Sequence, residues 1–197
     1  MIYPKIKSFL DKSVSVKITD ERKLMLNQIV DYIKSTDDPK LNFICTHNSR
    51  RSHLSQIWAQ VLAHQYGINV STYSGGTEAT AFHPNAVAAL KRAGLEITRA
   101  EGSNPRYSVS FSEKADSMIC YSKTFDDPVN PQANFAAIMT CSEADADCPF
   151  VPGASARIKL FFDDPKVSDG TSEEAKIYGE RCAQIAAEMN YVFSSIK

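Results

Sequence analysis

The stretch Leu41-Asn42-Phe43-Ile44-Cys45-Thr46-His47-Asn48-Ser49-Arg50-Arg51-Ser52 places a cysteine directly after a short apolar run and an arginine at the start of a helical pattern. Phe43 to Cys45 has the composition of a buried strand, and apolar residues from Ser52 to Tyr66 recur on one face of a helix. Gly67 stands where a C-terminal cap is expected. A loop between a strand and a helix N-terminus turns backbone N–H groups inward and adds the positive end of the helix dipole. The stretch therefore predicts an anion-binding loop that begins with a cysteine.

The side chains of this loop suit a tetrahedral oxyanion. Arg51 can hold two of its oxygens in a bidentate fork, which a lysine does not reproduce. The same field favours the thiolate form of Cys45, Ser52 can donate a hydrogen bond to the sulfur, and Asn48 can brace the loop. The predicted oxyanion-binding residues are Thr46, His47, Asn48, Ser49, Arg50 and Arg51. The alternative is a buried structural cysteine beside two surface arginines, which the preceding strand and following helix disfavour.

Outward from this stretch, strand and helix patterns alternate along the chain. Helical spacing predicts an N-terminal helical extension over residues 1–40, broken at Asp37-Asp38-Pro39. Further elements are predicted as strands over 69–74, 135–139 and 158–162, a helix from His83-Pro84-Asn85 to Gly94, and a long C-terminal helix capped by Thr171. The alternation indicates an α/β, three-layer fold with a central parallel β-sheet flanked by helices.

Residues 104–134 do not follow this alternation of strand and helix patterns. Tyr107 to Phe111 and Met118 to Phe125 have strand character and are separated by a charged segment. We therefore expect a β insertion at about 104–134 within one catalytic domain that spans residues 41–197.

Bulk composition narrows the class of protein. The chain has 197 residues with a formal net charge of −1, which argues against nucleic-acid binding. No apolar run approaches the ~20 residues of a membrane span, and no secretory signal pattern is present. A cytoplasmic protein with reduced thiols is expected, so its five cysteines call for an explanation as chemistry or as small buried residues.

Two of these cysteines lie together in Cys141-Ser142-Glu143-Ala144-Asp145-Ala146-Asp147-Cys148-Pro149, after the second apolar run. A pair of thiols can supply two electrons by forming a disulfide. Passive burial is the alternative, and a zinc site would need more ligands at closer spacing. Seven helical residues rise ~10.5 Å, whereas a disulfide needs Cα atoms within about 7 Å, so a helix here must unwind on oxidation. Cys120 and Cys182 fit core positions.

A proton donor is the remaining requirement for displacing oxygen from phosphorus or arsenic. Phe161-Phe162-Asp163-Asp164-Pro165 offers carboxylates on a proline-restrained loop after an apolar run. An ordinary acidic turn is the alternative, since Asp-Pro is common in turns.

Taken together, residues 41–197 resemble the low-molecular-weight phosphotyrosine phosphatase fold, which also houses the thioredoxin-coupled arsenate reductases. The resemblance implies that Cys45 is the nucleophile, Arg51 the oxyanion clamp and Asp164, rather than Asp163, the general acid. It also implies that Cys141 attacks a Cys45–arsenic adduct and that Cys148 then takes up the oxidation as a Cys141–Cys148 disulfide.

The sequence departs from the family in two loop positions. His47 stands where the family usually has a small residue, and Arg50 replaces a second loop cysteine that is common in it.

The leading hypothesis is therefore an arsenate reductase with Cys45, Arg51, Ser52, Asp164, Cys141 and Cys148 as its catalytic residues. Thioredoxin is the expected electron donor and partner, and neither a metal nor a bound cofactor is expected. One alternative is a low-molecular-weight protein tyrosine phosphatase, although Lys166, Val167 and Ser168 replace the aromatic residues that many such phosphatases place after the proline. Another is a non-catalytic oxyanion-binding or redox-sensing module. The sequence leaves the oligomeric state open.

Overall fold

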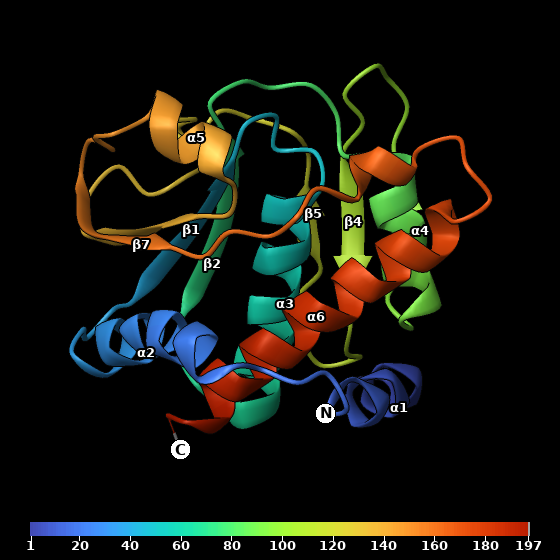
Figure 1. Ribbon diagram of the computed structural model, residues 1–197, viewed down its shortest axis with the longest axis horizontal. Helices are drawn as coiled ribbons and strands as arrows, with labels where there is room; N and C mark the ends of the chain where they lie inside the picture. Colours follow the sequence, from blue (N-terminus) through green and yellow to red (C-terminus); the bar gives the residue numbers. More distant parts are fainter. Residues whose placement is uncertain (197) are drawn as a thin grey trace.

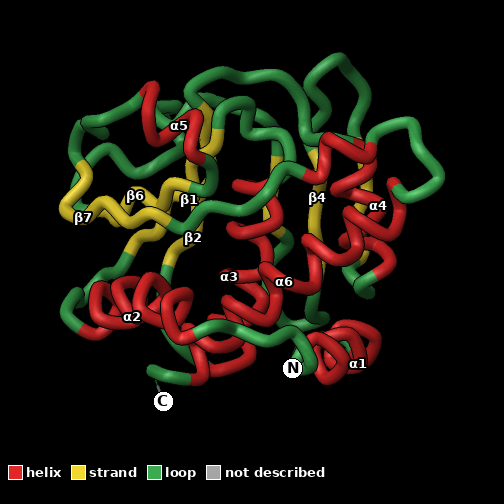
Figure 2. The backbone as a smooth tube through the Cα atoms, in the orientation of Figure 1, coloured by secondary structure: helices red, strands yellow, loops and turns green. Residues whose placement is uncertain are grey.

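Four parallel strands form the central sheet of the computed structural model, which describes residues 1–196 (Figures 1 and 2). Their order is β2-β1-β6-β7, and their bounds are β1 Lys40–Cys45, β2 Ser71–Gly76, β6 Phe135–Met139 and β7 Ala154–Lys159. Every residue of β6 is buried, and so is all of β1 beyond Lys40, as expected of central strands covered on both faces. The predicted three-layer α/β fold with a central parallel sheet is confirmed.

Helices from both halves of the chain cover this sheet. α3 (Arg51–Tyr66) lies against β1 and β2 and packs on α6 (Glu174–Ser194), while α4 (Pro84–Arg92) also contacts α6. Gly67 ends α3 with a φ of 68°, a left-handed conformation that glycine adopts without strain. The short helix α5 (Ser142–Asp147) lies beside the ends of β1 and β6. The carboxyl ends of these two strands therefore meet below α5.

The first forty residues form α1 (Pro4–Ser13) and α2 (Asp20–Lys34), which both pack on α6 (Figure 1). Ile6, Leu26 and Ile29 are fully buried in the same apolar core as α3 and α6. Arg22 of α2 donates from Nε and Nη2 to the carboxylate of Glu188, which is 3% exposed. This extension is thus part of the main core.

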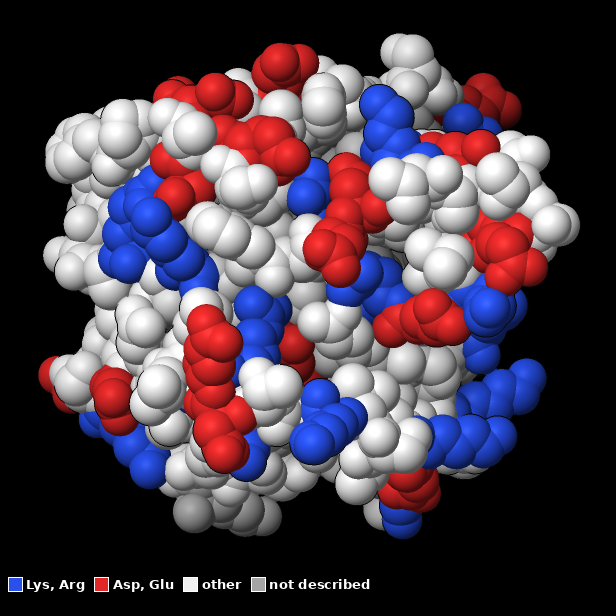
Figure 3. All heavy atoms as spheres, in the orientation of Figure 1, with Lys and Arg blue, Asp and Glu red and all other residues white. Residues whose placement is uncertain are grey.

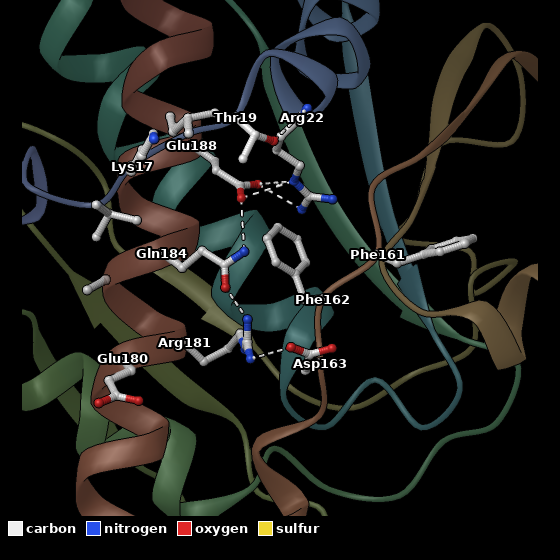
Figure 4. A pocket seen from close by; sticks show the side chains of 13 residues that line it. Lys17, Thr19, Arg22, Phe161, Phe162, Asp163, Glu180, Arg181, Gln184 and Glu188 are labelled. Carbon is white, nitrogen blue, oxygen red and sulfur yellow. Dashed lines mark hydrogen bonds and ion pairs between the residues drawn. The ribbon is translucent and has the colours of Figure 1, made fainter.

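A cavity of about 500 Å³ lies between this extension and α6 (Figure 4). Hydrogen bonds along its wall run from Glu188 through Gln184 and Arg181 to Asp163. The extension and the segment that carries Asp163 therefore share one wall of polar contacts.

A second, antiparallel sheet has the order β3-β4-β5, with bounds β3 Glu96–Arg99, β4 Tyr107–Ser110 and β5 Met118–Cys120. It begins with β3, before the predicted insertion at 104–134. The predicted strand over 118–125 is too long, because the ladder ends at Cys120. Thr124 instead bridges to Gly76 at the end of β2.

Other element boundaries also differ from the prediction. The strand expected over 69–74 is β2, Ser71–Gly76. The last strand is Ala154–Lys159 rather than 158–162, although Leu160 and Phe162 still donate backbone hydrogen bonds to Met139 and Thr140. Thr171 does not cap α6, because the helix begins at Glu174. The Thr171 hydroxyl accepts instead from the N–H of Glu173.

Within residues 1–196, no helix is long and apolar enough to cross a membrane.

Candidate active site

Residues 45–51, here called the 45–51 loop, connect β1 to α3 at the carboxyl edge of the sheet. Asn48 has a φ of 43°, and both the nitrogen and the oxygen of its side-chain amide form hydrogen bonds. Its Nδ2 donates to Ser52 Oγ at 2.8 Å, and its Oδ1 accepts from the backbone N–H of Lys123 at 3.0 Å. Because asparagine tolerates the left-handed region better than most residues, Asn48 can hold the turn of the loop.

Gly76, at the end of β2, backs the same loop. A Cβ on Gly76 would lie 2.6 Å from the carbonyl oxygen of Thr46 and 2.7 Å from the nitrogen of Asn48. The lack of a side chain is therefore what allows the loop to lie this close to β2.

Cys45 sits at the base of the loop with 3% of its surface exposed. Its Sγ lies 3.1 Å from Ser52 Oγ, which itself accepts from Asn48. Since the Asn48 donor fills one lone pair of the hydroxyl, the Ser52 hydrogen is free to point at the sulfur. The arrangement suits a thiolate at Cys45.

Arg51 is buried and brings the acidic segment onto the loop. Its Nη2 donates to Asp164 Oδ2 at 2.8 Å, and its Nη1 donates to the Phe162 carbonyl at 3.1 Å. Asp163 points the other way, 94% exposed, toward Arg181 at 3.1 Å. Of the two adjacent aspartates, Asp164 is thus the one beside the 45–51 loop.

Cys141 is fully buried and also lies at this loop. Its Sγ is 3.5 Å from Thr46 Oγ1 and accepts from the N–H of Ala144 at 3.4 Å, so it caps the N-terminus of α5. It packs in one apolar cluster with Cys45. Burial raises the pKa of the Cys141 thiol, while the hydrogen bonds from Thr46 and Ala144 and the charge of Arg51 oppose that rise.

Cys148 lies at the other end of α5 and is partly exposed. Its Sγ donates to the Phe150 carbonyl at 3.4 Å, and Arg157 donates to the Cys148 carbonyl at 3.0 Å. Burial raises the pKa of Cys148, opposed by the charge of Arg157. The two cysteines of the 141–148 segment are therefore separated by the length of α5.

The remaining loop residues differ in where their side chains point. His47 is partly exposed, 3.9 Å from Glu78, and Ser49 donates to the Ala81 carbonyl at 2.7 Å. The Arg50 guanidinium turns away from Arg51, to Tyr178 at 2.6 Å and Asp169 at 2.8 Å. Of Arg50, only the backbone N–H is left to serve the predicted oxyanion site.

Beside the loop, a cavity of about 560 Å³ is lined by Arg51, Ser142, Glu143, Phe161, Phe162, Asp163, Asp164 and Val167. Glu143 Oε2 lies 3.8 Å from Arg51 Nη1. On the face seen in Figure 3, acidic and basic side chains are interspersed. Sequence reasoning missed Glu143, Asp169 and Tyr178 around this site, because no spacing pattern signals contacts between residues so far apart in the chain.

Comparisons with known proteins agree with this geometry. A family model described as low molecular weight phosphotyrosine protein phosphatase matches residues 40–136. An arsenate reductase of Bacillus licheniformis is 32% identical over 71% of this chain and 83% of its own length. An arsenate reductase of Bacillus subtilis is 31% identical, with coverage of 71% and 83%.

Among solved structures, a low molecular weight protein tyrosine phosphatase from T. tengcongensis superposes with a TM-score of 0.55. It is 13% identical, and the match covers 80% of this chain and 99% of that one. This likeness concerns the fold, whereas the 32% identity extends over most of the chain. The chain belongs to the low molecular weight phosphotyrosine protein phosphatase family, close to its arsenate reductases.

Proposed function

We propose that this protein is an arsenate reductase in which Cys45, Cys141 and Cys148 act in turn and thioredoxin restores the thiols. The observation that carries the proposal is the position of Cys141, whose Sγ lies 3.5 Å from the hydroxyl of Thr46, the residue after Cys45. Hydrolysis of a phosphate ester needs no second thiol at this place. Reduction of arsenate to arsenite requires two electrons, and a second thiol beside Cys45 can supply them by forming a disulfide.

In the first step, arsenate binds in the 45–51 loop, held by backbone N–H groups and by the Arg51 fork. The Cys45 thiolate attacks arsenic and forms a sulfur–arsenic bond. One arsenic–oxygen bond breaks, and the departing oxygen takes a proton from Asp164 and leaves as water. The 2.8 Å contact between Arg51 and Asp164 supports the location of this group, because it keeps the carboxyl beside the loop, and Asp164 takes up a proton from solvent before it donates one.

In the second step, the Cys141 thiolate attacks Sγ of Cys45. A Cys45–Cys141 disulfide forms, the sulfur–arsenic bond breaks, and its electron pair stays on arsenic, which leaves as arsenite. The Thr46 hydroxyl and the Ala144 N–H can both donate to the attacking thiolate.

In the third step, the Cys148 thiolate attacks Sγ of Cys141 and releases Cys45 as a thiolate. The resulting Cys141–Cys148 disulfide is reduced by the dithiol of thioredoxin, whose two electrons balance those given to arsenic. Cys148 is the one partly exposed cysteine of the described residues, which suits contact with an external reductant. The cytoplasm, where thiols are kept reduced, is the compartment that fits this cycle.

The test supplies arsenate, thioredoxin, thioredoxin reductase and NADPH, and follows NADPH oxidation. We expect turnover by the wild type, none by Cys141→Ser or Cys148→Ser, and nearly wild-type turnover by the control Cys120→Ala, whose side chain is buried in a different apolar cluster from Cys45 and Cys141. The Cys148→Ser variant should still release one arsenite per chain. Equal NADPH oxidation in all four proteins would refute the relay.

Membership of the family keeps protein tyrosine phosphatase activity as the second candidate. The same loop, clamp and acid would hydrolyse an aryl phosphate, with water replacing Cys141 as the second nucleophile. Phosphotyrosine hydrolysis without arsenate turnover would establish this function instead. Phosphate binding with no turnover of either substrate would indicate a non-catalytic oxyanion-binding or redox-sensing module.

A further inference from the structure

Two neighbouring arginines of the 45–51 loop bind two aspartates at opposite ends of a single turn. The turn is the 3-10 helix η1 (Pro165–Ser168), with Asp164 as its N-cap and Asp169 as its C-cap. Arg51 donates to Asp164 and Arg50 to Asp169, both at 2.8 Å. Both ends of the turn are therefore fastened to the same loop.

Each aspartate also forms a hydrogen bond within the turn, at its own end. Asp164 Oδ1 accepts from the N–H of Lys166 at 3.0 Å, and the N–H of Asp169 donates to the Lys166 carbonyl at 3.0 Å. Pro165 follows Asp164 and fixes its own φ, so the turn has little freedom between its two ends. A shift of Asp169 must consequently be transmitted to Asp164.

Tyr178 of α6 is the centre of the attachment at Asp169. Its hydroxyl donates to Asp169 Oδ1 at 2.7 Å and accepts from Arg50 Nε at 2.6 Å. His83, the N-cap of α4, lies 3.3 Å from the same hydroxyl and stacks on the Tyr178 ring. The attachment thus joins the loop, the turn, α4 and α6.

The charges favour this arrangement. Burial alone would raise the pKa of Asp169, but the Tyr178 hydroxyl and the Arg50 charge outweigh it and lower that pKa. Burial and the hydrogen bond to Asp169 raise the pKa of Tyr178. Asp169 is therefore an anion and Tyr178 a neutral donor across the physiological range.

We infer that Asp169, held by Arg50 and Tyr178, is a positioning residue that sets the place of Asp164 at the 45–51 loop. The inference rests on the proposed role of Asp164 as proton donor. It also gives Arg50 a function at a position where the family commonly has a cysteine: its guanidinium holds the turn instead of the oxyanion.

A double-mutant cycle tests the inference, measured on arsenate reduction and on the hydrolysis of two aryl phosphates. Loss of the general acid in Asp164→Asn should lower kcat/KM about 10²-fold or more for phenyl phosphate, and much less for dinitrophenyl phosphate, whose leaving group needs no proton. Asp169→Asn and Tyr178→Phe should show the same dependence on the leaving group with a smaller loss, about tenfold.

The decisive quantity is the double variant Asp164→Asn/Asp169→Asn. If Asp169 acts through Asp164, the double variant is no slower than Asp164→Asn alone, whereas independent effects would multiply. The matched control is Tyr191→Phe, which removes another α6 hydroxyl, bonded to Asn27 at 3.0 Å. It should leave the ratio of the two aryl phosphate rates unchanged.

The outcomes separate the inference from the proposed function. Leaving-group dependence in Asp164→Asn but not in Asp169→Asn or Tyr178→Phe overturns the inference alone, as do multiplicative losses in the double variant. Absence of that dependence in Asp164→Asn overturns the role of Asp164 as proton donor and the inference with it, and leaves the cysteine relay to its own test. Aryl phosphate hydrolysis without arsenate turnover overturns the reductase function. The double-mutant cycle measured on the two aryl phosphates then still tests the inference.

Discussion

The hydroxyl of Thr46, in the 45–51 loop, lies 3.5 Å from Sγ of Cys141, at the N-terminus of α5. The contact joins the loop that holds the proposed nucleophile to the helix that holds the proposed resolving thiol. It also affects the chemistry of Cys141, because a hydrogen bond from Thr46 lowers a pKa that burial raises.

The first prediction concerns Thr46→Val, which keeps the shape of the side chain and removes its hydroxyl. A hydrogen bond to a charged group is worth ~1.5–3 kcal/mol, about tenfold or more in an equilibrium, so its loss should raise the pKa of Cys141. At neutral pH, arsenite release in a single turnover should slow about tenfold and recover as the pH rises. Thr80→Val removes a hydroxyl bonded to the His47 carbonyl at 3.2 Å and serves as the control. A pH profile unchanged from the wild type would contradict the role of Thr46.

The second prediction concerns α5. Its backbone hydrogen bonds include Asp145 N–H to the Cys141 carbonyl and Cys148 N–H to the Ala144 carbonyl, at 3.2 and 3.1 Å. Because a disulfide between its two ends requires a shorter span than the helix gives, oxidation must break these bonds. Hydrogen exchange of residues 142–148, followed by mass spectrometry, should quicken about tenfold or more in the oxidised wild type. Oxidised Cys148→Ser should keep the slow exchange, and equal rates in the two proteins would exclude the unwinding.

The elements that the sequence predicts correctly are those with strong local signals. The apolar run before Cys45, the glycine at 67 and the His83-Pro84 start all act within a few residues, and β1, the end of α3 and the start of α4 follow them. β3 has only one buried residue in four, so no apolar pattern marks it. β7 is misplaced because its pairing residues are mostly small or charged, while the apolar residues lie just after it.

The side chains of the site show the same division. The contact of Cys45 with Ser52 lies within one loop, and loop chemistry predicts it; the same reasoning gives Asn48 a bracing role without naming Ser52 as its partner. The contact of Arg50 with Tyr178 spans more than half the chain, and no local pattern signals it. Periodicity identifies the buried face of a helix but carries no information about the partner of a hydroxyl on that face.

The third prediction is a loss of stability in mild acid. His53 is fully buried and stacks on Phe82 at 4.0 Å, and burial followed by the charge of Lys123 places its pKa well below 6.5. The unfolded chain binds a proton at this residue near pH ~6.5, and the folded protein does not. The free energy of unfolding is therefore fully retained above pH ~6.5. Below that pH it decreases by about 1.4 kcal/mol for each pH unit.

The variant His53→Phe keeps a ring against Phe82 and removes the titrating group. Urea unfolding at several pH values between about 5 and 7 should give a shallower slope for this variant than for the wild type. The comparison uses slopes, since the substitution also changes the absolute free energy of unfolding. Parallel slopes in the two proteins would assign the acid sensitivity to other groups.

The fourth prediction concerns the glycine behind the loop. In Gly76→Ala the new Cβ would lie 2.3 Å from the Glu78 carbonyl oxygen and 2.6 Å from that of Thr46, and both are backbone atoms that cannot rotate away. The loop must shift, so phosphate should inhibit more weakly and turnover should fall about 10²-fold. Overpacking should also cost ~1–3 kcal/mol of unfolding free energy.

Gly179→Ala is the matched control, since a Cβ at that position of α6 meets no atom within 4 Å. Alanine favours a helix over glycine by about 1 kcal/mol, so this variant should unfold at a higher urea concentration and keep the wild-type phosphate inhibition constant. If Gly76→Ala also kept the wild-type phosphate inhibition constant, β2 would not be fixing the position of the 45–51 loop. A loop held only by Asn48 and its partners could shift away from the new Cβ and still bind the anion.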